Sequence, residues 1–319
     1  MEQVKELKAI LHSKRANIYY LEKCRVMQKD GRVLYLTQAQ NEYQYWNIPI
    51  ANTTCLLLGT GTSVTQAAMR MLASAGVLVG FAGGGGTPLF MGTEIEWMTP
   101  QSEYRPTEYL QGWMKFWFDD EKRLAVAKQF QQKRLDYLQQ CWTKDRELAA
   151  MGFIVKTDDL DRLVHTHTNA IERATSAQDL LSAEALITKK LYRLAAQVSG
   201  YQGFARNHDG GDLANDFLNH GNYLAYGLAA TTLWVLGIPH AFAVMHGKTR
   251  RGALVFDVAD LVKDALILPW SFALGQQGAS DQAFRQQCVH NFVRHKALDM
   301  MFESVKQGSL QSSSYRPSS

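Results

Sequence analysis

One short stretch of the sequence, residues 246–264 (HGKTRRGALVFDVADLVKD), combines a histidine, three aspartates and several basic side chains within 19 positions. The acidic residues are Asp257, Asp260 and Asp264, and His246 precedes them. Carboxylate oxygens are the ligands that Mg²⁺ and Mn²⁺ prefer, and an imidazole nitrogen favours Mn²⁺ or accommodates either ion. A divalent cation among basic side chains suits a phosphate substrate, so this stretch predicts metal-dependent phosphate chemistry.

The spacing of the aspartates gives this prediction a geometry. If residues 256–268 form a helix, the three carboxylates fall within about 60° of one another, at roughly 100° per residue. Like charges on one face repel, so that face is either fully solvated or bound to a cation. A solvated acidic face is the simpler interpretation of the stripe alone. Two further features favour a bound metal: His246 is nearby, and there are four basic neighbours, Lys248, Arg250, Arg251 and Lys263.

A metal site of this kind needs one more carboxylate, and Glu184 is the candidate. It lies near the start of an amphipathic stretch, residues 182–199, that also carries Lys189, Lys190 and Arg193. The alternative is an ordinary first-turn glutamate, which the helix dipole stabilises without any metal.

The elements that must position these residues begin with a β-rich region. Residues 17–26 and 32–37 are rich in β-branched and aromatic residues, and the turn between them contains Asp30-Gly31, which predicts a β-hairpin. The same region is predicted to hold a helix at residues 63–76 and further strands at 45–50, 54–58 and 77–82.

The chain changes character near residue 98, where a polar segment with Pro100 and Pro106 follows. Beyond it the hydrophobic pattern is helical, at residues 108–140, 182–199, 221–236 and 256–268. The predicted class is α+β, with an N-terminal β-rich domain (1–98), a C-terminal mostly α-helical catalytic domain (99–307) and a disordered tail (308–319).

Composition narrows the class of protein. With 319 residues, 46% of them hydrophobic, wholesale disorder is excluded, and a net charge of +4 permits binding to a polyanion without requiring it. The cysteines, Cys24, Cys55, Cys141 and Cys288, are too far apart for a CxxC metal or redox pair. The charged N-terminus lacks the apolar core of a signal peptide, so we expect a cytoplasmic protein.

Residues 221–245 contain no Asp, Glu, Lys or Arg and are long enough to cross a bilayer. Asn222 and the sequence Gly237-Ile238-Pro239 favour instead a buried core helix followed by a turn. We therefore predict no membrane association, and a membrane span is the alternative.

A set of motifs in fixed order resembles one protein family. Glu184 is followed by Tyr192, Asn215, Tyr226-Gly227, His246-Gly247-Lys248 and FDVAD (256–260) with Lys263. The sequence resembles the CRISPR-associated spacer integrases, the metal-dependent endonuclease subunits of the adaptation machinery, from about residue 11 to residue 272. The N-terminal sequences LHSKRANIYYL, YWNIPIANTT, LLLGTGTSVTQAAM, GGGGTPLF and TPQSEYRPTEYLQ resemble the type I-F branch.

The resemblance implies roles for individual residues. Glu184, His246 and Asp260 would coordinate a catalytic Mg²⁺ or Mn²⁺, and Asp257 would be a supporting carboxylate of the same site. Other positions match basic residues beside the family's site (Lys248 and Lys263) or residues of the helix behind it (Asn215 and Tyr226). Lys248 and Lys263 are expected to bind DNA, together with Arg250 and Arg251, which charge clustering adds.

The implied reaction inserts captured DNA into a CRISPR repeat: a 3′-hydroxyl attacks a phosphate by transesterification, and the same centre acts as a nuclease with water. The sequence presents no activated side-chain nucleophile, which agrees with direct metal-assisted attack. The implied partners are double-stranded and branched DNA, a second copy of the chain joined largely through the β-rich domains, and a fused adaptation-subunit/helicase-nuclease protein. The alternative is a non-catalytic DNA-binding subunit of a nucleoprotein assembly.

Overall fold

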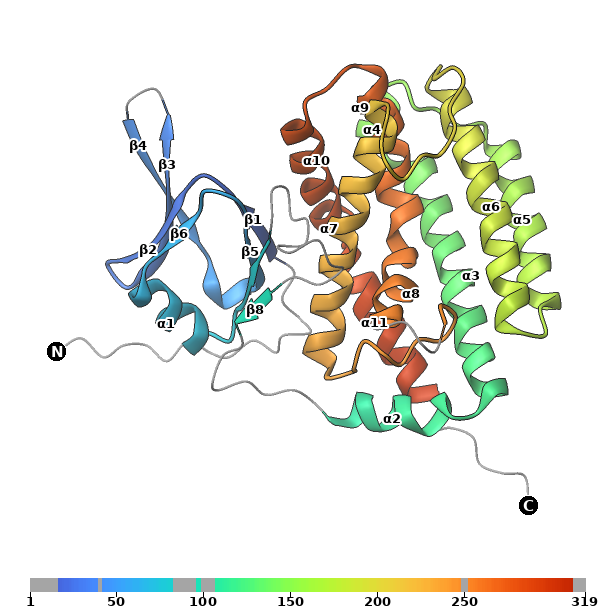
Figure 1. Cartoon of the computed structure of the whole chain (residues 1–319), viewed down its shortest axis with the longest axis horizontal. Helices are drawn as coiled ribbons and strands as arrows, with labels where there is room; N and C mark the ends of the chain where they lie inside the picture. Colours follow the sequence, from blue (N-terminus) through green and yellow to red (C-terminus); the bar gives the residue numbers. More distant parts are fainter. Residues whose placement is uncertain (1–16, 40–41, 83–95, 99–106, 248–251, 312–319) are drawn as a thin grey trace. The chain divides into compact units, whose positions relative to one another are not determined.

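The computed structural model describes residues 17–39, 42–82, 96–98, 107–247 and 252–311. The chain divides into two compact units between Arg105 and Pro106. The predicted boundary after residue 98 adjoins residues 99–106, which lie outside the described residues. The first unit is rich in strands and the second is helical (Figure 1), which confirms the predicted α+β class.

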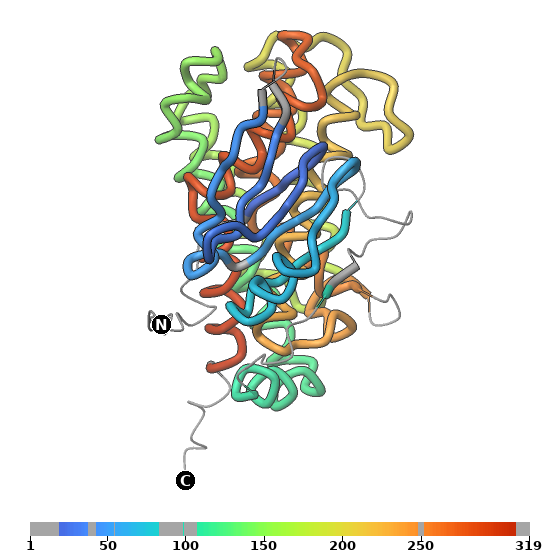
Figure 2. The backbone as a smooth tube through the Cα atoms, turned by 90° about the vertical axis from the view of Figure 1, so that its left-hand side faces the viewer, coloured from blue at the N-terminus to red at the C-terminus, as the bar shows by residue number. Residues whose placement is uncertain are grey.

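The described strands of the first unit form two sheets. One has the order β1 (Asn17–Leu21), β5 (Thr53–Leu58), β7 (Leu78–Phe81) and β8 (Glu96–Met98), with only β8 antiparallel to its neighbour. The other has the order β4 (Glu42–Ile48), β3 (Arg32–Ala39), β2 (Arg25–Lys29) and β6 (Ser63–Val64). The last residues of β3 pair with β4 alone, so these two strands extend past β2 (Figure 2).

The predicted hairpin turn at Asp30-Gly31 is present, but its first strand is shorter than expected. Residues 17–26 are not one strand: the chain turns at Lys23, whose φ is 49°, and β1 pairs with β5 in the other sheet. The hairpin joins β2 to β3, across Asp30 and Gly31 with φ values of 49° and 70°. Two left-handed residues give the tight turn whose twist matches that of paired strands.

The predicted helix at 63–76 is shorter than expected. The helix α1 is Gln66–Ser74, because the hydroxyl of Thr65 caps it by accepting the Ala68 N–H, while residues 63–64 belong to β6. Ala68 and Leu72 lie one turn apart and are fully buried. Their packing against the strands and the short helix η2 (Ile50–Asn52) forms the core of this unit.

The second unit consists of helices around a buried centre. Their bounds are α2 (Thr107–Trp117), α3 (Asp120–Lys144), α4 (Arg146–Ala150), α5 (Thr157–Arg173), α6 (Ala177–Val198), α7 (Leu213–Leu236), α8 (Ala253–Val262), the π-helical turn η4 (Lys263–Ile267), α9 (Leu268–Gln276), α10 (Asp281–Arg294) and α11 (Ala297–Gln311). The stretch predicted as one helix from 108 to 140 is interrupted at Asp119, whose carboxylate accepts the first N–H groups of α3. Helix α8 packs against both α3 and α7 (Figure 1).

The apolar stretch at 221–245 is a core helix followed by a turn, as predicted. Helix α7 is buried along most of its length and ends at Leu236, where Gly237 takes a left-handed conformation with φ 69°. Across the described ranges, no helix combines the length and apolar character needed to span a membrane.

The helix predicted at 256–268 contains an irregularity that the sequence did not reveal. A π turn holds an extra residue, so the side chains that follow Val262 take angular positions different from those of a continuous α-helix. The three aspartates do not form a solvated acidic face. All three are buried, and each has different partners.

The end of the chain also differs from the prediction. Helix α11 continues to Gln311, four residues into the segment predicted as a disordered tail. Gly308 lies so close to α3 that a Cβ atom there would be 3.1 Å from Val126, and Ser309 is fully buried. Burial of these residues explains why the helix extends, and residues 312–319 lie outside the described residues.

Candidate metal centre

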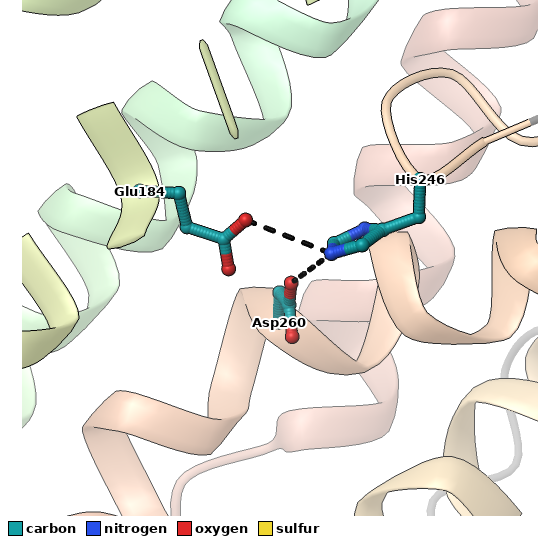
Figure 3. Close-up of side chains that lie close together, drawn as sticks. All are labelled: Glu184, His246 and Asp260. Carbon is teal, nitrogen blue, oxygen red and sulfur yellow. Dashed lines mark ion pairs between the residues drawn. The ribbon is translucent and has the colours of Figure 1, made fainter. Parts of the chain in front are cut away.

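Three side chains from three separate elements meet in the helical unit. Glu184 comes from α6, Asp260 from α8 and His246 from the loop between α7 and α8 (Figure 3). The Nε2 atom of His246 lies 3.6 Å from a Glu184 oxygen and 3.8 Å from an Asp260 oxygen. One potential ligand atom from each residue falls within 4.8 Å of the others, a separation that one metal ion can bridge.

Asp260 supplies a test of whether these residues fit a metal. Its side chain is 2% exposed, and Lys263 forms an ion pair with its Oδ1. Within the described residues its Oδ2 has no hydrogen-bond donor. A buried oxygen without a donor is costly, and a metal cation would supply the partner that Oδ2 lacks. The residues therefore fit a Mg²⁺ or Mn²⁺ ion.

Asp257 sets the orientation of His246. One of its oxygens accepts a hydrogen bond from the His246 Nδ1, at 2.7 Å, and the backbone N–H of His246, at 3.0 Å. In a neutral imidazole this places the proton on Nδ1 and leaves the lone pair of Nε2 facing Glu184 and Asp260. Asp257, predicted as a supporting carboxylate, thus reaches the cluster through His246.

The loop that carries His246 is held from two sides. The second Asp257 oxygen accepts the backbone N–H groups of Val244 and Met245, at 2.7 and 3.2 Å. On α2, Trp113 donates its indole N–H to the Phe242 carbonyl and Trp117 donates to the Ala243 carbonyl, at 3.0 and 2.7 Å. Neither tryptophan was identified from the sequence, where α2 shows only an amphipathic pattern.

Arg134 on α3 is a further residue that sequence reasoning missed. Its side chain is 3% exposed, and its Nη1 lies 3.0 Å from Glu184 Oε1. Its Nε donates to Asp264 at 2.8 Å. The available signal was its position: Arg134 occupies the buried face of α3, between Phe130 and Leu138, where apolar residues are expected.

Lys263 and Tyr226, both predicted near the site, are neighbours. The Lys263 Nζ lies 5.4 Å from the centre of the Tyr226 ring, and that ring packs edge-on against Phe256. The side chain of Lys263 is 19% exposed and pairs with Asp260, so in this structure its contact is with the cluster itself.

The remaining predicted residues lie apart from the cluster or outside the described residues. Asn215 is in the first turn of α7, where its amide accepts from Asn207 N–H and donates to the Ala205 carbonyl, holding the preceding loop. Lys248, Arg250 and Arg251 fall within the undescribed residues 248–251.

Burial and charge shift the protonation of the three clustered residues. Burial, reinforced by Asp260, raises the pKa of Glu184 to about 7. For Asp260, burial opposes ionisation, but Lys263, Arg134 and His246 outweigh it and lower the pKa to about 2. For His246, burial disfavours the charged form, yet the hydrogen bond to Asp257 and the nearby carboxylates raise the pKa above its ordinary value. Protons therefore compete with a metal at Glu184 and His246.

The whole chain is similar to proteins of one known family. The family model described as CRISPR associated protein Cas1 matches residues 18–305. The chain is 59% identical over 307 residues to a CRISPR-associated endonuclease Cas1 of Pseudomonas aeruginosa, covering 94% of this chain and 95% of the relative. It is 56% identical over 307 residues to a CRISPR-associated endonuclease Cas1 of Pectobacterium atrosepticum, covering 94% of each.

A solved structure shares the fold at low sequence identity. The crystal structure of a TtCas1–DNA complex superposes with a TM-score of 0.60 at 20% identity, over 91% of this chain and 90% of that one.

Proposed function

Because this chain belongs to the family of CRISPR-associated protein Cas1, we propose that it is a metal-dependent DNA endonuclease and integrase that inserts captured DNA fragments into a CRISPR repeat array. The observation that carries the metal dependence is the buried Oδ2 of Asp260, which lacks a hydrogen-bond donor among the described residues and lies beside Glu184 and His246.

The donor atoms for the ion are the Glu184 carboxylate, the Nε2 of His246 and the Asp260 carboxylate. A bound Mg²⁺ or Mn²⁺ supplies Lewis-acid polarisation of a DNA phosphate and stabilises the leaving oxygen. Asp257 keeps the proton on Nδ1 of His246, so that Nε2 stays available as a ligand. Lys263 holds Asp260 ionised by its positive charge.

In the proposed integration step, the 3′-hydroxyl oxygen of the captured DNA forms a bond to a phosphorus atom of the repeat. The bond from that phosphorus to the 3′-oxygen of the repeat breaks, and this oxygen leaves with a proton, so the number of phosphodiester bonds is conserved. With water as the nucleophile, the same displacement hydrolyses the DNA.

The DNA partners are double-stranded and branched DNA of the CRISPR repeat, which basic side chains including Lys248, Arg250 and Arg251 would contact through phosphates. Such binding weakens steeply with salt, because each neutralised phosphate releases counterions. The TtCas1–DNA complex supports DNA as a ligand of this fold.

The assembly that we propose follows the resemblance to the type I-F branch. Residues 1–98 would join two copies of the chain, and residues 99–307 would carry out catalysis. The partner would be a fused adaptation-subunit/helicase-nuclease protein. The four cysteines are buried thiols, and thiols persist in the reducing cytoplasm, where we propose that the protein acts.

The test is cleavage and strand transfer on a branched DNA substrate with Mn²⁺, Mg²⁺ or EDTA. We expect His246→Ala and Asp260→Ala to abolish both reactions while DNA binding persists, and His165→Ala, at an exposed histidine of α5, to match the parent. Undiminished activity in both site variants would overturn the assigned centre. DNA binding without chemistry in any metal, with the partner protein present, would instead identify a non-catalytic assembly subunit.

A further inference from the structure

Arg134 contributes a buried positive charge between two carboxylates on different elements. Its Nε donates to Asp264 on η4, and its Nη2 also pairs with Asp264 and lies 3.2 Å from the Thr188 hydroxyl. Its Nη1 contacts Glu184 Oε1, at 3.0 Å, and Gln131. Every guanidinium nitrogen therefore has a partner, and the planar fork is fixed in one orientation.

This arrangement treats the two oxygens of Glu184 differently. Oε1 faces Arg134, whereas Oε2 faces the Nε2 of His246, as the pair of dashed lines meeting at the imidazole in Figure 3 indicates. A carboxylate binds a divalent cation through either one oxygen or both. With Oε1 engaged by Arg134, only Oε2 is directed at the cluster.

Glu184 has space to turn if Arg134 releases it. A cavity of about 60 Å³ borders Glu184, and its other lining residues include Arg134, Thr188, Tyr192, Lys263 and Asp264. One water needs about 10–15 Å³ of such space, so the cavity is large enough for several. Glu184 therefore borders open space on this side, where Arg134 is its ion-pair partner.

We propose that Arg134 is a positioning residue that restricts Glu184 to binding the metal through Oε2 alone. This inference rests on the proposed metal-dependent function. The chain then supplies one donor atom each from Glu184, His246 and Asp260. Because Mg²⁺ and Mn²⁺ favour about six ligands, about three coordination positions remain for water and DNA oxygens.

Asp264 holds the guanidinium of Arg134 in place. Its side chain is 8% exposed, and it receives two nitrogens of the Arg134 guanidinium. Asp264 lies in the first turn of η4 and faces Arg134 on α3, for which it is a counter-ion. Replacing Arg134 alone would leave this carboxylate buried and unpaired.

The test compares Arg134→Met/Asp264→Asn with Asp264→Asn. The double variant removes both members of the ion pair and keeps the net charge, whereas the single variant retains Arg134 beside Glu184. Mn²⁺ affinity is measured by calorimetry, and the number of waters on bound Mn²⁺ by water-proton relaxation. We expect the parent and Asp264→Asn to carry about three waters and the double variant to carry one fewer, because Oε1 joins the ion.

Equal hydration of Mn²⁺ in all three proteins would overturn this inference and leave the proposed function intact. Absence of Mn²⁺ binding by the parent would overturn both. If thermal melting shows the double variant unfolded, Arg134→Lys replaces it: a single ammonium cannot hold Glu184 and Asp264 through separate nitrogens, so we again expect one water fewer. A folded Arg134→Lys protein with the parent's hydration would refute the positioning role.

Discussion

The carboxylate of Asp257 organises more of the centre than any metal ligand does, and replacing it by asparagine tests this directly. One oxygen accepts from the backbone and the ring of His246, and the other from the N–H groups of Val244 and Met245. The asparagine side chain of the Asp257→Asn variant would have nearly the same size but only one accepting oxygen. Its NH₂ group would face one of these two pairs of donors.

The magnitude follows from the number of bonds lost. Either orientation of the amide removes two hydrogen bonds to a charged acceptor, each about 1.5–3 kcal/mol, so Asp257→Asn should lower the free energy of unfolding by about 3–6 kcal/mol. The loss is near-complete because Asp257 is 4% exposed and water cannot replace the acceptor. Metal affinity should fall by about 10- to 100-fold, since the imidazole loses the partner that fixes its protonated nitrogen.

Two assays measure these effects. Urea unfolding gives the stability, and calorimetry with Mn²⁺ gives the affinity. Asp209→Asn, at an exposed loop position, is the matched control and should lie within about 0.5 kcal/mol of the parent. Parent-like Mn²⁺ affinity in a folded Asp257→Asn protein would refute the argument that Asp257 orients His246.

Three further predictions use other parts of the structure. Mn²⁺ affinity should rise between pH 6 and 8, because the raised pKa values of Glu184 (about 7) and His246 mean that protons must leave before the ion binds, and calorimetry showing no pH dependence would contradict this. Trp117→Phe should lower stability by about 1–3 kcal/mol, since it removes the indole N–H that donates to the Ala243 carbonyl and part of the ring that packs against Phe242, and an unchanged urea midpoint would argue against a role of Trp117 in holding this loop. Gly221→Ala should destabilise by about 1–3 kcal/mol, because a Cβ there would lie 2.4 Å from a side-chain atom of η4, and a parent-like melting temperature would show that α7 and η4 do not pack closely.

Local sequence patterns predicted most elements because each pattern reports burial of one face. The apolar runs at 54–58 and 77–82 became β5 and β7, and the uncharged stretch at 221–245 became the core of α7 and its terminating turn. The failures occur where a local choice depends on distant contacts. Residues 17–26 divide between two sheets because β5 is a better partner for β1 than β3 is, and nothing within that segment encodes β5.

In the candidate site, too, the residues that were not predicted are those whose roles depend on distant contacts. The family resemblance singled out Glu184, His246 and Asp260, and the structure brings these three side chains together. The predicted acidic stripe also included Asp264, which was given no metal role, and the structure pairs it with Arg134. The groups that hold the ligands were not predicted, because their contacts join residues more than a hundred positions apart, as in Trp113 with Phe242 and Arg134 with Asp264.

Each of the three clustered side chains is held in place by a different kind of interaction. A guanidinium holds Glu184, a carboxylate orients His246, and burial in α8 together with the Lys263 charge fixes Asp260. The residues that make these interactions lie on α3, α8 and η4, so the relative placement of the donor atoms depends on how these helices pack and not on the ligand residues alone. Substitutions in that packing should therefore change metal binding before they unfold the protein, because a displacement of less than an ångström alters coordination while the large apolar core remains buried.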